Sequence, residues 1–266
     1  MLPVEDLVQR IQLAEAQGFD SVWLADHAFI EMEGRRAAGH EPLIVLAYAA
    51  ARTRRIRLGT LVLCAPFRLP GQVAREAAAL TDAAGGRFVL GLGAGWHQPE
   101  FDALDLPFDH LVSRFEEYLD AVTRLQSGGR VDLTGRYYSL HGAELFATAP
   151  APPIWIAGMG PRLMRLASRL ADGVNLAWGE KDPAWMREPL AVLLRELAAE
   201  GRDRAAMTVS VGVAIEPARA DDVSRLLETY EGEGVDEVIL RLGRPPNGDA
   251  YRPRHQELAA EALRSR

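Results

Sequence analysis

The chain alternates between short apolar segments typical of β-strands and longer segments in which apolar residues recur at helical spacing. The pattern predicts seven strands and eight helices, beginning with a helix. The predicted strands cover residues 21–25, 56–64, 88–92, 154–157, 174–178, 207–215 and 235–240. Such alternation requires parallel strands joined by right-handed crossovers. We therefore predict an α/β fold built on one parallel sheet.

The length of 266 residues matches one (β/α)8 TIM-type barrel, and no linker divides the chain. Residues 1–266 are therefore predicted to form a single domain. Eight strands would require one more before Val4, which the first three residues cannot supply. We expect a barrel that lacks its first strand and has a seam there. Residues 97–153 are predicted to be an insertion between the fourth and fifth strands, with a helix and a hairpin over 131–133 and 137–140.

Composition excludes several classes of protein. The net charge of −7 argues against a general nucleic-acid binder. The single cysteine, Cys64, excludes an internal disulfide and favours a cytoplasmic location. No apolar run reaches the length of a membrane span, and the first residues lack the pattern of a signal peptide. Histidines and carboxylates show no metal-ligand spacing, so no metal site is predicted.

Two ionisable residues, Asp26 and His27, follow the first predicted strand. The carboxyl ends of parallel strands meet at one face of a barrel, where active sites lie. A histidine there can donate, accept or carry a proton near neutral pH. We predict a catalytic role for His27 and an orienting role for Asp26, against the simpler reading that both only hydrogen-bond their neighbours.

Two glycine-rich turns also follow predicted strands. Residues 157–160 (AGMG) precede Pro161, which suits the first position of a helix. A turn of this kind directs main-chain N–H groups toward an anion. The turn at 91–95 (GLGAG) lacks the third glycine of a dinucleotide fingerprint, and no helix is predicted directly after it. A Rossmann fold is therefore not favoured.

Four segments together resemble the bacterial luciferase-like superfamily. They are GFDSVWLADH (18–27), RIRLGTLVLC (55–64), GGRFVLGLGAGW (85–96) and IWIAGMG (154–160). The similarity is closest to the branch of deazaflavin-dependent oxidoreductases that use coenzyme F420. The resemblance implies a (β/α)8 barrel with an insertion, which agrees with the independent count of strands.

The resemblance also implies a cofactor site at the carboxyl ends of the strands. It assigns His27 to the reactive edge of the ring, and Leu61–Val62 to a bulge with a non-prolyl cis peptide under one face of the ring. The loop along the ring would comprise Gly93, Ala94, Gly95 and Trp96. The main-chain N–H groups that hold the cofactor phosphate would come from Ala157, Gly158, Met159 and Gly160.

The expected function is hydride transfer between coenzyme F420 and a small organic substrate. The only lysine is Lys181, which argues against a sugar phosphate, since the branch that oxidises sugar phosphates uses lysines in its substrate pocket. One alternative is a monooxygenase that uses FMN and a partner flavin reductase. Another is a non-catalytic relative that has lost cofactor binding. The resemblance further implies a homodimer.

Overall fold

The computed structural model describes residues 2–32, 35–179, 182–242 and 253–265. Seven parallel strands form one curved sheet in the order β1-β4-β6-β9-β10-β11-β12, and the short β5 also pairs with β6. The bounds are β1 (Ser21–Leu24), β4 (Arg57–Thr60), β5 (Leu63–Cys64), β6 (Phe88–Gly93), β9 (Ile154–Ala157), β10 (Gly173–Gly179), β11 (Thr208–Ile215) and β12 (Glu237–Leu242). The predicted parallel α/β barrel is confirmed. Because the strands are parallel, their carboxyl ends form one mouth.

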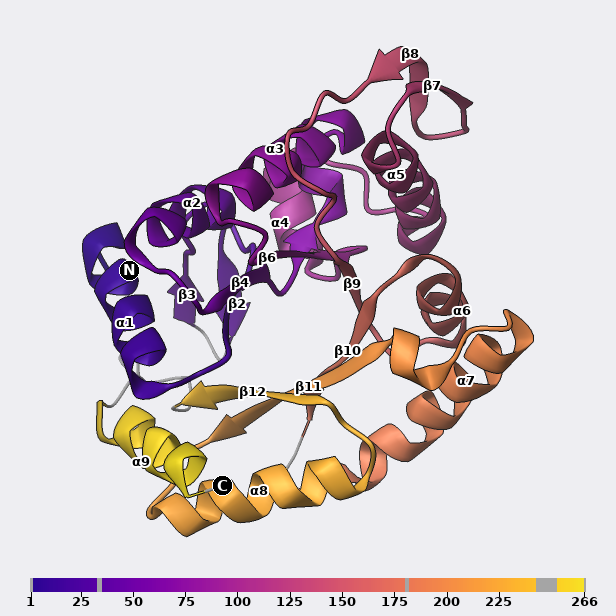
Figure 1. Cartoon of the computed structure of the whole chain (residues 1–266). Coiled ribbons are helices and arrows are strands. Elements are labelled where there is room, and N and C mark those ends of the chain that lie inside the picture. The colour runs from indigo at the N-terminus through magenta and orange to yellow at the C-terminus, as the bar shows by residue number, and fades with distance from the viewer. Residues whose placement is uncertain (1, 33–34, 180–181, 243–252, 266) are drawn as a thin grey trace.

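Helices surround the sheet on its outer side (Figure 1). They are α1 (Val4–Gln17), α2 (Pro42–Arg52), α3 (Pro70–Ala83), α6 (Pro161–Leu170), α7 (Arg187–Ala199), α8 (Ala220–Gly232) and α9 (Pro253–Arg264). Three-residue and four-residue 3-10 turns cover Ala65–Phe67, Pro183–Met186 and Arg204–Ala206. Proline at the first turn suits a helix start, because its missing N–H has no partner there in any case. Gly18 ends α1 in the left-handed conformation, with φ of 90°.

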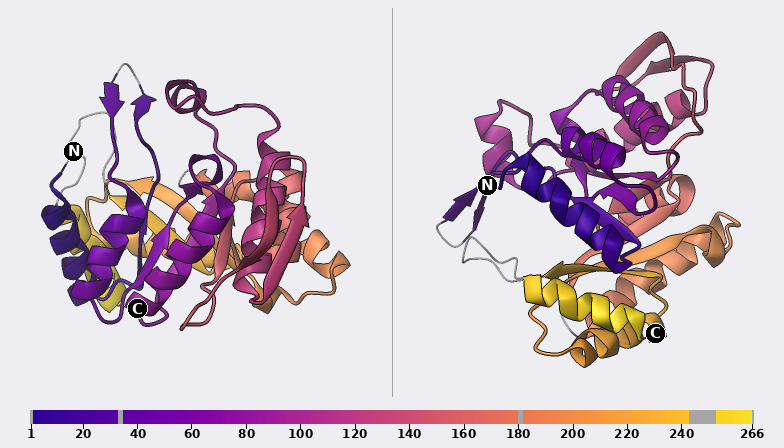
Figure 2. Two further views of the ribbon diagram at one scale, coloured as in Figure 1. Left: turned by 90° about the horizontal axis from the view of Figure 1, so that it is seen from above. Right: turned by 60° about the vertical axis from the view of Figure 1, so that its left-hand side comes forward.

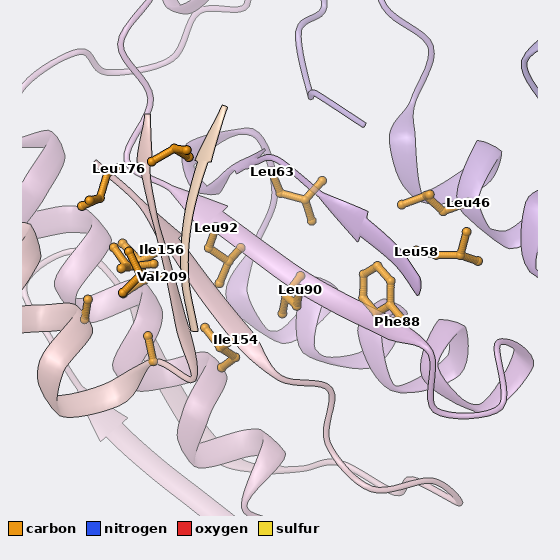
Figure 3. Close-up of a cluster of buried hydrophobic side chains, with 14 of the residues drawn as sticks. Leu46, Leu58, Leu63, Phe88, Leu90, Leu92, Ile154, Ile156, Leu176 and Val209 are labelled. Carbon is orange, nitrogen blue, oxygen red and sulfur yellow. The ribbon is translucent and has the colours of Figure 1, made fainter. Parts of the chain in front are cut away.

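The main core lies between the sheet and the helices. Figure 3 shows part of it, in which apolar side chains from successive strands and from α2 lie close together. The residues labelled there are Leu46, Leu58, Leu63, Phe88, Leu90, Leu92, Ile154, Ile156, Leu176 and Val209. This core fixes the strands relative to one another, and so it fixes the loops at the mouth.

A smaller core fills the barrel. The rings of Trp23 on β1 and Trp155 on β9 lie 4.5 Å apart between centroids. They pack with Leu61, Val89 and Ile239, which lie on the same inner face of the sheet. The two indole rings fill interior volume that smaller side chains would leave empty. Side chains therefore fill the inside of the barrel below the mouth.

The predicted seam lies between β1 and β12, the two ends of the strand order. No main-chain pairing joins these strands within the described residues. Side chains bridge them instead, because the carboxylate of Glu237 accepts hydrogen bonds from the Ser21 hydroxyl and from Trp23 Nε1, the latter at 3.0 Å. Arg57 Nη2 donates to the same carboxylate at 2.7 Å. The helices beside the seam also meet, through a hydrogen bond from Gln256 to Gln17 at 2.7 Å.

Replacing Glu237 with alanine is expected to destabilise the fold by about 1–3 kcal/mol, because three donors lose their shared acceptor. Chemical denaturation would measure the change in the free energy of unfolding. The exposed Glu228 on α8 provides the control, since its replacement with alanine should change stability by less than about 0.5 kcal/mol. Equal effects of the two substitutions would contradict the bridging role of Glu237.

The structure corrects three details of the prediction. The polar loop after β1 contains an antiparallel hairpin, β2 (Ile30–Met32) and β3 (Arg35–Ala37), which projects away from the barrel (Figure 2). The strand predicted over 56–64 is interrupted between β4 and β5. A short helix, α4 (Gln98–Ala103), follows the glycine-rich turn closely. All three are short elements, for which periodicity is a weak signal.

The interval 97–153 lies between β6 and β9. Besides α4 it contains α5 (Leu111–Gln126) and an antiparallel hairpin, β7 (Arg130–Thr134) and β8 (Ser139–Glu144). The hairpin predicted there is therefore confirmed. Glu117 on α5 accepts hydrogen bonds from main-chain N–H groups of its turn, including that of Tyr137 at 2.7 Å. These contacts hold the hairpin against α5.

Candidate active site at the mouth of the barrel

Three predicted parts of the site follow parallel strands and therefore lie at the same end of the barrel. His27 follows β1, the turn at 93–96 follows β6, and the turn at 157–160 follows β9. The peptide bond between Leu61 and Val62, which separates β4 from β5, is cis, as the family resemblance implied. The fold thus brings these segments, far apart in sequence, to one mouth.

His27 is paired with a buried carboxylate. Its Nδ1 lies 2.8 Å from Oε2 of Glu100, on α4. The other oxygen of Glu100, Oε1, accepts a hydrogen bond from the main-chain N–H of Phe29 at 3.2 Å. Glu100 is only 2 % exposed, whereas the side chain of His27 is 27 % exposed. The imidazole is therefore held from one side and remains accessible to a ligand.

Asp26 has different partners from those predicted. Its buried carboxylate forms an ion pair with both terminal nitrogens of Arg68 and accepts a hydrogen bond from the N–H of Cys64 at 3.0 Å. Arg68 also pairs with Glu41, the N-cap of α2, at 2.7 Å. The carboxylate that orients His27 is that of Glu100 and not that of Asp26. Asp26 instead ties the exit of β1 to the segment after β5.

Aromatic rings surround His27. The ring of Trp96 lies 5.7 Å from that of His27 in an edge-on arrangement, and Trp96 is 63 % exposed. His97 lies 5.1 Å from Trp96 and 6.2 Å from Phe29 between ring centroids. Nε2 of His97 is buried without a hydrogen-bond partner among the described residues. These rings form an apolar wall with polar edges, which suits a planar ligand.

The glycines of the β6 turn allow close packing beneath this wall. A Cβ atom at Gly93 would lie 2.6 Å from Cγ2 of Val62. Gly95 has φ of 85°, and a Cβ there would approach the ring of Phe101 and the sulfur of Cys64. Ala94 packs against the main core. The turn can therefore lie directly against the cis bulge at 61–62.

The turn after β9 offers main-chain donors. The N–H groups of Met159 and Gly160 have no main-chain acceptor within the described residues, and they precede the first turn of α6. A Cβ at Gly160 would meet nothing within 4 Å, so the space beside it is open. The N–H of Gly158 is different, because it donates to the carbonyl of Asn175 at 3.0 Å. The anion site predicted over Ala157–Gly160 therefore depends on its later residues.

Other chemistries receive little support. Burial raises the pKa of the Cys64 thiol, and the carboxylates of Asp26 and Glu100 raise it further, so this cysteine is a poor nucleophile. Among the residues that the structure describes, no three His, Cys, Asp or Glu side chains gather as metal ligands. None of the described helices has both the length and the apolar composition needed to cross a bilayer.

Glu100 is the main residue that the sequence did not reveal. It lies 73 positions from His27, and acidic residues are rarely buried, so its own residue type does not mark it as a site residue. The one local signal is the neighbouring Pro99, which favours the start of a helix close to the mouth. Recognising α4 would have placed a carboxylate near the exit of β1.

Comparison with known proteins identifies a family and relatives of this chain. Residues 2–266 match the model of the family described as luciferase-like monooxygenase. An F420-dependent glucose-6-phosphate dehydrogenase from Beutenbergia cavernae is 35 % identical over 265 residues, which are 97 % of this chain and 76 % of that protein. A 5,10-methylenetetrahydromethanopterin reductase from Methanolobus tindarius is 28 % identical, over 93 % of this chain and 74 % of that protein.

The curated relatives are longer than this chain, which matches only part of their length. Two further F420-dependent glucose-6-phosphate dehydrogenases, from Kineococcus radiotolerans and Intrasporangium calvum, are matched over 57 % and 64 % of their length. Among solved structures, an F420-dependent secondary alcohol dehydrogenase with an F420–acetone adduct has a TM-score of 0.84 at 17 % identity, covering 99 % of this chain and 95 % of that one. That likeness establishes the fold. Because the family model spans nearly all of the sequence, the chain belongs to the luciferase-like monooxygenase family.

Proposed function

We propose that the protein transfers a hydride between coenzyme F420 and a small organic substrate. The observation that carries the proposal is the pairing of His27 with the buried Glu100 at the same mouth as the open amide turn before α6. Relatives described as F420-dependent dehydrogenases support this choice of cofactor. When bound, a deazaflavin gives or accepts the hydride, and the protein supplies position and proton transfer.

The described residues fit a planar ring with an anionic tail. The cis bulge at 61–62 and the turn at 93–96 offer a close-packed surface for one face of the ring. The open N–H groups of Met159 and Gly160 suit a phosphate, because a helix N-terminus lies behind them. His27 would lie beside the reactive edge, where it exchanges a proton with the substrate oxygen.

The substrate is proposed to be a hydrophobic, uncharged molecule: an alcohol, a ketone, an enone or a heteroaromatic compound. The exposed ring of Trp96 stands at the rim, and the layer packed below the mouth, which includes Trp23, Trp155 and Ile239, is apolar. An apolar rim above an apolar core favours apolar groups over polyanions. Lys181, the only lysine, lies outside the described residues. We therefore propose a substrate class different from the sugar phosphate named for several relatives.

Titrating the purified protein with F420 and, separately, with FMN tests the proposal. We expect saturable binding of F420, and anaerobic turnover of F420 with a panel of secondary alcohols and ketones. Tight binding of FMN, with turnover that needs oxygen and a flavin reductase, would instead identify a monooxygenase. A stably folded protein that binds neither cofactor would identify a non-catalytic relative, and either of these results would refute the proposal.

We also propose that the enzyme acts in the cytoplasm, in line with its single cysteine. We propose in addition that it is a homodimer, as the family resemblance implies. Sedimentation of the purified protein would give its state of assembly.

A further inference from the structure

We infer that Glu100 is a positioning residue that fixes the tautomer of His27 and joins the imidazole to the base of the β2–β3 hairpin. The catalytic consequence of this inference rests on the proposed function. The tautomer itself does not, because it is a property of the protein without cofactor or substrate.

Both oxygens of Glu100 are used, and both contacts are made with the segment that follows β1. Oε2 lies 2.8 Å from Nδ1 of His27, and Oε1 accepts from the N–H of Phe29 at 3.2 Å. An ionised carboxylate only accepts hydrogen bonds, so Nδ1 must carry the proton. In a neutral imidazole, a proton on Nδ1 leaves Nε2 as an acceptor. Glu100 therefore sets which nitrogen of His27 is available to a ligand.

This tautomer suits the oxidation of an alcohol. Nε2 of His27 would accept the proton of the substrate hydroxyl, and a bound deazaflavin would take the hydride of the adjacent C–H bond, which leaves a carbonyl product and an imidazolium. In the reverse direction, the imidazolium would return that proton to the carbonyl oxygen. The opposite tautomer presents an N–H to the substrate and cannot accept the hydroxyl proton. The buried carboxylate also stabilises the imidazolium that oxidation produces.

The hairpin is fastened at the same place. The N–H of Gly39 donates to the carbonyl of His27 at 3.0 Å, so residues on both sides of the hairpin meet at His27. A Cβ at Gly39 would lie 2.8 Å from that carbonyl oxygen, which leaves no room for a side chain. Phe29, at the start of the hairpin, is held by Glu100. The imidazole, Glu100 and the base of the hairpin therefore form one hydrogen-bonded unit.

The tautomer can be read from the imidazole nitrogens by 15N NMR of the labelled full chain without cofactor, with His27→Gln used to assign the signals. We expect the neutral imidazole of wild-type His27 to carry its proton on Nδ1. In Glu100→Gln the population with the proton on Nε2 should rise, because an amide no longer demands a donor at Nδ1. A wild-type proton on Nε2, or an unchanged tautomer in Glu100→Gln, would overturn the inference.

Glu117→Gln is the matched control. Glu117 also lies on a helix and accepts hydrogen bonds from main-chain N–H groups of a hairpin, those of Arg136, Tyr137 and Tyr138. Its partners all lie in the β7–β8 hairpin and none in the segment after β1, so its substitution should leave the tautomer of His27 unchanged. A shift in Glu117→Gln equal to that in Glu100→Gln would assign the effect to general loosening of the fold, and would also overturn the inference.

Kinetics separate this inference from the proposed function. If the enzyme uses F420, Glu100→Gln should lower kcat about 10–100-fold with a smaller change in KM, whereas Glu117→Gln should be near wild type. If no F420 activity is found while the tautomer behaves as expected, the proposed function fails and the positioning role of Glu100 stands. If activity is found and the wild-type tautomer is the opposite one, only the positioning role fails. A wild-type proton on Nε2 would refute the positioning role even if Glu100→Gln does not fold.

Discussion

Replacing His27 with alanine is expected to lower kcat by about 10²–10⁴-fold, while the affinity for the cofactor falls much less. The imidazole lies at the mouth, held by Glu100 and 27 % exposed, so it can exchange a proton with a bound substrate. The cofactor is expected to be held mainly by the main chain of the turns at 93–96 and 157–160, which the substitution leaves in place. Steady-state kinetics with F420, together with a binding titration, would measure both quantities.

His141→Ala provides the control for this prediction, because His141 is exposed on β8 in the insertion. Its activity should equal that of the wild-type enzyme. Turnover of His27→Ala at the wild-type rate would remove His27 from the mechanism. Loss of cofactor binding in parallel with activity would make His27 a binding residue, contrary to the expectation. Circular dichroism of both variants would verify that they are folded.

Gly91→Ala is expected to be the most destabilising of the conservative substitutions considered, at about 3 kcal/mol, the upper end of typical overpacking costs. A Cβ at Gly91 would lie 1.9 Å from the main-chain oxygen of Thr60, and a main-chain atom cannot move aside cheaply. The Thr60 hydroxyl also bonds both the N–H and the carbonyl of Gly91, at 2.9 and 2.8 Å. The clash would therefore disturb β4 next to the bulge at 61–62. Chemical denaturation would measure the loss.

Gly232→Ala is the matched control. Gly232 is the last residue of α8, and a Cβ there would meet nothing within 4 Å. Alanine in a helix is favoured over glycine by roughly 0.5–1 kcal/mol, so this variant should be as stable as the wild type or slightly more so. If Gly91→Ala kept wild-type stability, the close approach of β4 and β6 at this point would be wrong.

The fold was largely predictable because its signals are local. Periodic apolar residues marked the barrel strands and the principal helices, and parallel pairing followed from their alternation. The seam was predictable as well, since a count of strands exposes the gap. The β2–β3 hairpin was missed because its strands are three residues each, too short for the alternation in β2 to mark a strand, and β3 (Arg35–Ala37) has no apolar alternation at all. Its position depends on Gly39 and His27, which pair across the loop.

The site was predictable only in part, for a physical reason. His27 could be identified because the exit of a parallel strand is a special position in any barrel. Glu100 could not, since its burial is tolerable only beside His27 and the N–H of Phe29, and those contacts exist only in the folded chain. Asp26 was assigned to the wrong neighbour because adjacency in sequence says little about which cation, here Arg68, reaches a carboxylate.

The seam has a consequence for the order in which the chain acquires its structure. Each βα unit can dock on the preceding one as a nearest neighbour, but the contact between Ser21 and Glu237 joins residues 216 positions apart. The contact between Gln17 and Gln256, also across the seam, joins residues 239 positions apart. Contacts of such long range carry a large loop-closure entropy, so we expect the seam to form last. Until the seam forms, the edges of β1 and β12 can pair with strands of other chains. We therefore expect misassembly to be greatest when many newly made copies fold close together.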